Sequence, residues 1–434
     1  MKRSSTTGLA LLIALGVTAP ASADEPGRTG PDNAITDVAG VLVGHHTDRA
    51  TITGTTALVM PKGSTAGADV RGGAPGTINT DLLDPVALRP EVHGLFLSGG
   101  SVMGLSAYAG VVHHLREQGL GSKFLGKAIP VVPGAIVFDL GQGVDADDPI
   151  ERTPDFDAGY QAAKAARPGP VEMGSVGAGT GTGTDGPPGT RLKGGVGTAS
   201  IRLDGGVVVG ALVVLNSAGK VYNEALGCEL HALHMEVGDE YGDTRRPPRG
   251  CRTSTAGSGP APRGGGTDGA VDENTTIGVV ATNATLTVAQ AEKFAQVAHD
   301  GLARAIRPAH SMGDGDTTFG ISTRTTGAPD DLGYEAILDA AASTFSRATV
   351  HAALAATPLG GRPTYCEVFA GACDTHRPAG DDVDPAPGSG GPGAAPAPPS
   401  GNSPVPTLPL AITAVVFWTL WRRRTADATR DRLR

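Results

Sequence analysis

The sequence predicts a layered α/β fold, and three observations support this interpretation. Short apolar or alternating runs bounded by Gly, Pro or Asn are typical of buried strands, and helical patterns lie between them. Strands and helices do not alternate strictly, which favours a layered arrangement over a doubly wound parallel sheet. Hydrophobic residues make up 39% of the 434 residues, which is enough for a core despite 65 Gly and 33 Pro.

The individual elements follow from these patterns. Seven runs are predicted to be strands, and they cover residues 35–43, 56–59, 94–97, 129–132, 198–203, 207–214 and 276–281. Four helices are predicted, over residues 106–118, 157–166, 288–306 and 334–356. In the third helix Thr287 is a suitable N-cap, and Gln290 three residues later can complete a capping box.

The N-terminal end carries an export signal. Lys2 and Arg3 precede the apolar run 9–17, and residues 21–23 (Ala-Ser-Ala) are the small residues that a signal peptidase recognises. We therefore expect residues 1–23 to be a signal peptide. The alternative is a membrane anchor, but this apolar run is too short to span a bilayer.

The C-terminal end carries a membrane signal. Residues 376–405 contain eight Pro and six Gly, which predicts an extended linker. The uncharged stretch 405–421 ends in two Trp residues, and three Arg follow it, so we expect a transmembrane anchor with 422–434 as a basic cytoplasmic tail. The stretch is at the short limit for a membrane helix, so a disordered tail is the alternative. The folded part would lie outside the cell.

Charge and cysteine content narrow the function classes further. A net charge of −9 argues against nucleic acid as a partner, because binding phosphates needs an excess of basic residues. In an exported chain four cysteines favour disulfides. Pairing of Cys228 with Cys251 and of Cys366 with Cys373 would close two loops, although the sequence leaves the connectivity open. The cysteines lack the close pairs of a zinc site.

Several common catalytic motifs are absent from the sequence. Without GxSxG or HExxH, neither the α/β-hydrolase elbow nor a zincin is expected. The Gly-rich segment 174–197 does not match a phosphate-binding loop. Neighbouring histidines at 45–46 and 113–114 point apart on a strand or helix, so a shared metal is not expected. We expect neither a metal nor a cofactor.

One segment combines a nucleophile with a means of activating it. The Gly-rich residues 253–269 lead to Asn274 and Thr275, just before the predicted strand 276–281. If the chain is cut before Thr275, the new α-amine has a pKa of about 8 and can accept the proton of its own hydroxyl. On this pattern alone, a simple turn leading into a strand is the favoured alternative.

Seven longer stretches resemble the L-aminopeptidase/D-esterase family, which includes β-peptidyl aminopeptidases and nylon-oligomer hydrolases. The resemblance covers about residues 33–357 and is carried, in family order, by ITDVAGVLVGHHTD, VRGGAPGT, GLFLSGGSVMGL, IPVVPGAIVFDLG, KGGVGTAS, NTTIGVVAT and DGDTTF. It implies a four-layer αββα sandwich similar to the N-terminal nucleophile hydrolases. It also implies self-cleavage into an α part, residues 24–274, and a β part, residues 275–374. Residues 236–269 look like an insertion.

The same resemblance assigns the site residues. The cut falls between Asn274 and Thr275, and Thr275 is the nucleophile. The supporting residues that it implies are Lys193, Asn216, Asp314 and Asp316. Lysine would lower the pKa of the Thr275 amine, asparagine would donate to the developing oxyanion, and the aspartates would orient the amine or bind a substrate amino group. For the aspartates, an Asp-Gly turn is the alternative, and an incomplete DxDxDG pattern weakens a calcium loop.

The sequence therefore predicts a self-cleaving hydrolase that acts through an acyl-enzyme on the N-terminal residues of peptides or small amides. One alternative is a hydrolase of non-peptide amide oligomers of the nylon type. Another is a catalytically silent surface-binding protein, against which the complete set of site residues argues. We expect a homo-oligomer of αβ units that is attached to the membrane through its C-terminal helix.

Overall fold

The computed structural model describes residues 27–88, 91–141, 152–252 and 274–373. The predicted signal peptide, linker, anchor and tail lie outside these residues, as does the Gly-rich segment 253–269. No helix in the described part of the chain is long and apolar enough to cross a membrane. The two disulfides that the sequence left open are formed between Cys228 and Cys251 and between Cys366 and Cys373.

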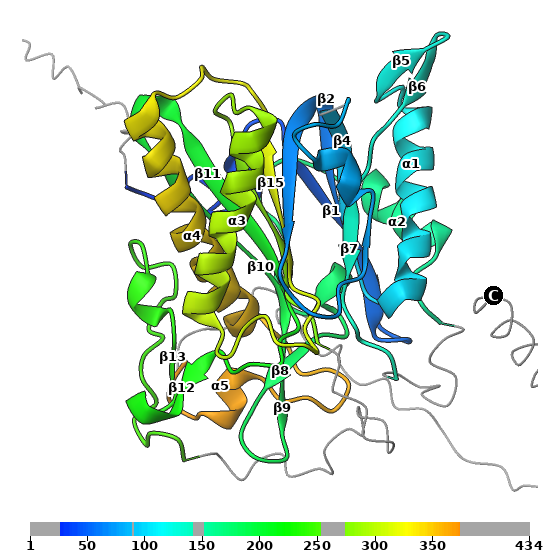
Figure 1. The fold of residues 1–434 in the computed structure, drawn as a ribbon. Helices are drawn as coiled ribbons and strands as arrows, with labels where there is room; N and C mark the ends of the chain where they lie inside the picture. The colour runs from blue at the N-terminus through cyan, green and yellow to red at the C-terminus, as the bar shows by residue number, and fades with distance from the viewer. Residues whose placement is uncertain (1–26, 89–90, 142–151, 253–273, 374–434) are drawn as a thin grey trace, which may run out of the picture. The chain divides into compact units, whose positions relative to one another are not determined.

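A mixed sheet of nine strands forms the centre of the described residues (Figure 1). Its order is β10-β11-β14-β15-β2-β4-β7-β3, and β1 also pairs with β2. The strands are β1 (Leu42–Asp48), β2 (Thr53–Val70), β3 (Thr77–Ile78), β4 (Glu91–Ser98), β7 (Gly134–Ile136), β10 (Gly195–Arg202), β11 (Val208–Leu215), β14 (Ile277–Thr282) and β15 (Thr317–Ser322). Three small ladders lie outside it: β5 (Ser122–Phe124) with β6 (Lys127–Ile129), β8 (Gly183–Asp185) with β9 (Arg191–Lys193), and β12 (Tyr222–Asn223) with β13 (Glu229–Leu230).

Strand β2 joins two halves of the sheet. Its first part pairs with β1 and β4, and its last part pairs with β15. The register against β4 shifts between Val59 and Ser64, where Pro61, Lys62 and Gly63 interrupt the apolar run. Because β2 is 18 residues long, it serves both halves, so the hydrogen bonds form one continuous sheet rather than two separate ones.

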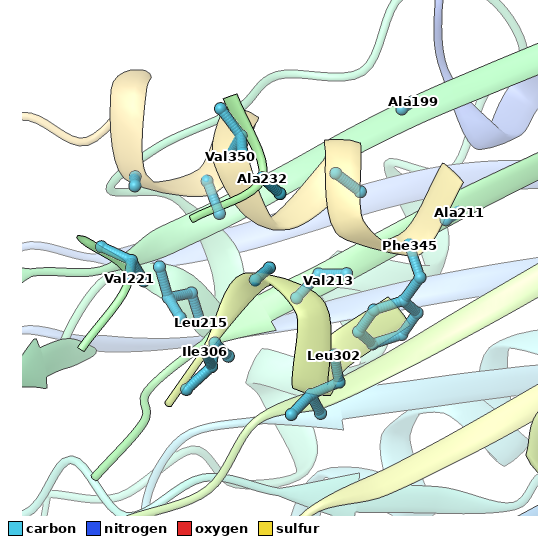
Figure 2. Packing of buried hydrophobic residues seen from close by; sticks show 14 of the residues in the cluster. Ala199, Ala211, Val213, Leu215, Val221, Ala232, Leu302, Ile306, Phe345 and Val350 are labelled. Carbon is cyan, nitrogen blue, oxygen red and sulfur yellow. The ribbon is translucent and has the colours of Figure 1, made fainter. Parts of the chain in front are cut away.

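Two helix pairs cover the outer faces of the halves (Figure 1). Helices α3 (Val288–Ala305) and α4 (Asp331–Leu354) pack on each other and on β10, β11 and β15. Figure 2 shows Phe345 and Leu302 of these helices beside Val213 of β11. Helices α1 (Ala107–Glu117) and α2 (Phe156–Lys164) pack on β1, β2 and β4.

A second core lies between the inner faces of the two halves. It brings Leu58 and Leu95 from β2 and β4 together with Leu212, Val279 and Phe319 from β11, β14 and β15. The order through the described residues is therefore helix pair, half-sheet, half-sheet, helix pair. This agrees with the expected mixed α/β layering.

All four predicted helices are present, with ends that differ by a few residues. The capping box at the start of α3 is confirmed, because the Thr287 hydroxyl accepts from the Gln290 amide at 3.2 Å and the Gln290 side chain accepts from the Thr287 amide at 3.0 Å. The predicted strands at 94–97, 198–203, 207–214 and 276–281 are confirmed as β4, β10, β11 and β14.

Two strand predictions were wrong in part, a third was too short, and several strands were missed, β15 among them. Residues 35–43 begin with a 3-10 turn (Ile35–Asp37), since the Asp37 carboxylate accepts from the Ala34 amide at 2.9 Å. The segment 56–59 is only a piece of β2. The segment 129–132 contains the end of β6, and Pro130 prevents its continuation because proline has no amide donor.

The described start of the predicted insertion is fixed to the body by a buried carboxylate. Glu240 accepts from Arg347 of α4 at 2.5 Å and 2.6 Å, and it contacts His351 at 3.0 Å. It also accepts from Asn33 at 2.7 Å. Burial opposes the charge, but the hydrogen bonds from His351 and Arg347 outweigh it and lower the pKa of Glu240 to about 2. The network therefore holds the N-terminal turn, this segment and α4 together.

Candidate active site

The ends of three neighbouring strands bring most of the predicted site residues to one edge of the sheet. Strand β14 is antiparallel to β11, with Ile277 opposite Val214, and parallel to β15, with Ile277 opposite Thr317. Extending both registers by two residues places Thr275 between Asn216 and Gly315. An isolated bridge between Asn274 and Asp314 continues the pairing. The parallel strands β14 and β15 begin at this edge and β11 ends there, so segments far apart in the sequence meet.

The peptide bond between Asn274 and Thr275 lies at the centre of this edge. Both residues are only 3% exposed. The Thr275 amide donates to the Asn216 carbonyl oxygen at 2.6 Å, and the Thr275 hydroxyl donates to the Asn274 carbonyl oxygen at 2.5 Å. The same carbonyl oxygen accepts from the Gly315 amide at 2.8 Å. A hydroxyl and a backbone amide therefore both donate to the oxygen of one buried carbonyl.

The two aspartates hold the backbone around this bond. Asp316 accepts from the Thr276 amide at 2.7 Å through Oδ1, and through Oδ2 it contacts His310 Nδ1 at 2.9 Å. Asp314 accepts from the amides of Ala218 at 3.2 Å and Ser311 at 2.9 Å. Each aspartate is 1% exposed. Asp314 and Asp316 therefore lie close to Thr275, and their carboxylates hold the start of β14 and the segments 218 and 310–311 beside it. The turn in this segment lies at residues 312–313, not at the Asp-Gly pair that the alternative had placed there.

Asn216 is fixed through both ends of its side-chain amide. Its Oδ1 accepts from the Gly183 amide and its Nδ2 donates to the Phe138 carbonyl oxygen, each at 2.9 Å. In this uncut form the side-chain amide therefore serves the loops around it, while the Asn216 backbone carbonyl is the group that contacts Thr275.

Lys193 is the last residue of β9 and is connected to Asn216 through Gly183. Its backbone pairs with Gly183, the residue that holds the Asn216 side chain. Its Nζ donates to the carbonyl oxygens of Gly179 at 2.8 Å and Gly194 at 2.9 Å, rather than to Thr275. The lysine is 1% exposed, and this burial lowers its pKa well below the usual range.

Two further buried charges flank Lys193, and the sequence analysis missed both. Asp139 accepts from the Gly100 amide at 2.6 Å and from the Thr53 hydroxyl at 2.8 Å. Burial raises the pKa of Asp139 to about 6. Arg362 donates to the Gly181 carbonyl oxygen, and burial lowers its pKa to about 10. Arg362 lowers and Asp139 raises the pKa of Lys193.

The sequence features that could have drawn attention to Asp139 and Arg362 differ. Asp139 lies in the stretch IPVVPGAIVFDLG, where an acid directly after an apolar run could have been noticed. Arg362 lies in a Gly-Gly-Arg-Pro turn that carries no recognisable pattern. Arg191, which donates to Asn274 Oδ1 at 2.7 Å, was also missed, although it is only two residues before Lys193.

A family model and the sequences of several known proteins match most of this chain. The family model described as peptidase family S58 matches residues 33–365. An uncharacterized aminopeptidase of Mycobacterium leprae is 39% identical over 369 residues, which cover 80% of this chain and 96% of that protein. A 6-aminohexanoate-oligomer endohydrolase of Kocuria sp. is 29% identical over 296 residues, which cover 68% of this chain and 76% of that protein.

Two solved structures share the fold. A beta-aminopeptidase from Burkholderia sp. matches with a TM-score of 0.56 and 23% identity, over 79% of this chain and 92% of that chain. The L-aminopeptidase D-Ala-esterase/amidase from Ochrobactrum anthropi, described as a variant of the Ntn hydrolase fold, matches with a TM-score of 0.55 and 24% identity, over 77% of this chain and 89% of that chain. The described residues thus adopt an Ntn-hydrolase type of fold.

Proposed function

The chain belongs to peptidase family S58, the L-aminopeptidase/D-esterase family, and we propose that it is an aminopeptidase whose nucleophile, Thr275, is freed when the chain cuts itself after Asn274. One observation carries this proposal. The Thr275 hydroxyl and the Gly315 amide both lie on the Asn274 carbonyl oxygen, at 2.5 Å and 2.8 Å. A nucleophile and an oxyanion donor are thus present at one buried peptide bond.

Self-cleavage would proceed through an ester. Thr275 Oγ1 attacks the Asn274 carbonyl carbon, and the Gly315 amide stabilises the negative charge that develops on the oxygen. The bond from this carbon to the Thr275 nitrogen then breaks, and the nitrogen takes the hydroxyl proton. Water hydrolyses the resulting ester, which leaves Asn274 with a carboxylate and Thr275 with a free α-amine and a free hydroxyl.

The mature enzyme would repeat the same chemistry on a substrate. The Thr275 amine accepts the hydroxyl proton while Oγ1 attacks the substrate carbonyl carbon. The substrate C–N bond then breaks, the leaving amine takes this proton, and water hydrolyses the acyl-enzyme that remains. The Asn216 carbonyl oxygen, which now accepts from the Thr275 amide at 2.6 Å, can orient the freed amine. The oxyanion role of the Asn216 side chain and the electrostatic role of Lys193 belong to this proposal, with Asp314 and Asp316 as supports of the strand starts.

The test uses two neighbouring threonines. Thr276 is a matched control for Thr275, because it is fully buried and its hydroxyl has no hydrogen-bond partner within the described residues. We expect the wild type and Thr276→Val to yield a fragment that begins at Thr275, and Thr275→Ala to stay whole. Intact mass and N-terminal sequencing report the products. An uncut wild type, or a cut Thr275→Ala chain, would contradict the mechanism.

The substrate class separates the main proposal from a second candidate. The relative from Kocuria sp., whose name states that it is a 6-aminohexanoate-oligomer endohydrolase, favours hydrolysis of linear non-peptide amides as that second candidate. Amino-acid amides and 6-aminohexanoate oligomers tested side by side distinguish the two. A chain that neither cuts itself nor hydrolyses either class would instead support the silent surface-binding protein.

We also propose that the enzyme is exported and anchored to the membrane by residues 405–421. The two disulfides support an oxidising compartment. After cleavage, the α and β parts should remain together, because β14 of the β part pairs with β11 of the α part. We propose that these αβ units form a homo-oligomer. Cell fractionation, protease shaving and gel filtration after detergent extraction test the location and the assembly.

A further inference from the structure

Asn274 is held in the site through its backbone amide, its carbonyl oxygen and its side chain. Its amide donates to the Gly313 carbonyl oxygen at 2.9 Å, and its carbonyl oxygen accepts from the Gly315 amide at 2.8 Å. Its side-chain Oδ1 accepts from Arg191 Nη2 at 2.7 Å. The amide, the carbonyl and the side chain of this residue therefore each have a specific partner.

Arg191 is positioned independently of Asn274. It begins β9, where it pairs with Asp185 of β8. Its Nη2 also donates to the carbonyl oxygens of Gly183 at 3.2 Å and Ser217 at 3.4 Å. These backbone contacts keep the guanidinium in place when Asn274 leaves. The guanidinium is therefore available to an oxygen acceptor of another residue that takes the place of Asn274, and a hydrogen bond from a charged donor is among the stronger ones.

The chemistry of the two reactions links this arrangement to the substrate. The maturation ester joins the Asn274 carbonyl carbon to Thr275 Oγ1. The acyl-enzyme of the mature form joins a substrate carbonyl carbon to the same oxygen. Both are hydrolysed by water at the same place, so the groups that hold the first acyl residue are available to hold the second.

We propose that the space occupied by Asn274 is the acyl subsite of the mature enzyme, and that Arg191 selects acyl residues with a carboxamide or carboxylate on Cβ, as in Asn or Asp. This inference rests on the proposed function, since it requires Thr275 to be the nucleophile. The substrate amino group takes the place of the Asn274 amide and donates to the Gly313 carbonyl oxygen. Asn274 itself must leave this space after cleavage.

The geometry favours a short side chain with an oxygen acceptor. A single methylene separates the Asn274 side-chain carboxamide from Cα, and this length already brings Oδ1 to 2.7 Å from the guanidinium. An alanine residue offers no acceptor there. A large apolar residue would place carbon against the charged donor and remove its partner.

The first experiment compares p-nitroanilides of Asn, Asp and Ala as substrates. We expect the wild type to prefer Asn or Asp over Ala, and Arg191→Gln to reduce that preference, as a ratio of kcat/KM values, by about 10- to 100-fold. Arg246→Gln is the control, because this arginine pairs with Glu229 in an exposed salt bridge. The control should keep the wild-type ratio. The Asn and Asp substrates show which acceptor is preferred.

The second experiment tests the hydrogen bond between Arg191 and the Asn274 side chain in the uncut chain. Arg191→Gln should slow self-cleavage when Asn274 is present and have no further effect in an Asn274→Ala background, since the arginine acts through that side chain. Equal slowing in both backgrounds would overturn the proposal. So would a wild type without preference for Asn or Asp, or an Arg191→Gln ratio equal to that of the wild type.

The outcomes also separate this inference from the proposed function. If the chain cuts itself and hydrolyses the Ala anilide, but Arg191→Gln leaves the ratio unchanged, the proposed function stands and the subsite assignment fails. If no fragment beginning at Thr275 forms and no anilide is hydrolysed, the proposed function fails and the subsite assignment falls with it.

Discussion

Replacing Gly315 with alanine displaces the proposed oxyanion donor of self-cleavage relative to the Thr275 hydroxyl, although the backbone amide itself is kept. The backbone φ of Gly315 lies outside the left-handed region, so alanine can adopt it, and only the available space opposes the substitution. A Cβ atom there would lie 2.7 Å from Thr275 Oγ1 and 2.7 Å from the Ala74 carbonyl oxygen. Real Cβ contacts are essentially never this short, so the nucleophile, the Gly315 amide or both must move.

The expected effect is large on the rate and moderate on stability. Loss of one oxyanion donor slows acyl transfer by about 100- to 1,000-fold, which corresponds to roughly 3–4 kcal/mol. Overpacking by one methyl group destabilises a fold by about 1–3 kcal/mol. We therefore expect Gly315→Ala to fold and to cut itself at least about 100-fold more slowly than the wild type.

The assay follows the uncut fraction of freshly made precursor over time by mass spectrometry, with denaturant unfolding as the measure of stability. Gly327→Ala is the matched control, because a Cβ at Gly327 meets nothing within 4 Å. This control should cleave at the wild-type rate. A folded Gly315→Ala chain that cleaves within about threefold of the wild type would refute the need for this close placement of the Gly315 amide and the Thr275 hydroxyl.

Two further predictions concern charge. Asp139 raises and Arg362 lowers the pKa of Lys193. In a plot of kcat/KM against pH, Asp139→Asn should therefore move the limb that reports Lys193 to lower pH, and Arg362→Gln should move it to higher pH. Shifts of this limb in the same direction for both variants would contradict the prediction. Glu240→Gln should lower the free energy of unfolding by about 3 kcal/mol at pH 7, because the pKa of Glu240 falls from 4.5 to about 2 in the folded chain. This loss should shrink as the pH drops from about 4.5 towards 2, since the wild-type carboxylate is then protonated as well. Denaturant unfolding at both ends of this range checks it, and the control Glu224→Gln, at an exposed ion pair, should change little.

Local patterns were sufficient for most of the secondary structure. Helix α3 follows from its 3.6-residue periodicity and from the capping box of Thr287 and Gln290, both of which are properties of neighbouring residues. Strands β10, β11 and β14 follow from short apolar or alternating runs. The full length of β2 could not be predicted from local patterns, because Pro61 and Lys62 interrupt its apolar run. Only the pairing with β4 and β15 makes it one strand.

In the candidate site, too, some features could be predicted from the sequence and others could not. The hydroxyl of Thr275 and the carbonyl that it contacts belong to adjacent residues, so the sequence could raise self-cleavage there as a hypothesis. The pattern alone favoured a simple turn, and the family resemblance was what implied the cut. The Gly315 amide on that carbonyl, and Arg191 on the Asn274 side chain, arise from contacts between residues far apart in the chain. No sequence pattern links them, because their meeting depends on strand register.

The sequence by itself determined the residue types of the candidate site: a threonine after Asn274, a lysine, an asparagine and an Asp-Gly-Asp segment. The tertiary structure decided where they lie relative to one another. Hydrogen-bond register between β11, β14 and β15 brings Asn216, Thr275 and Gly315 side by side. Burial of Lys193 with Asp139 and Arg362 then changes the pKa of each, because removing charges from water alters the balance between their protonated and deprotonated forms.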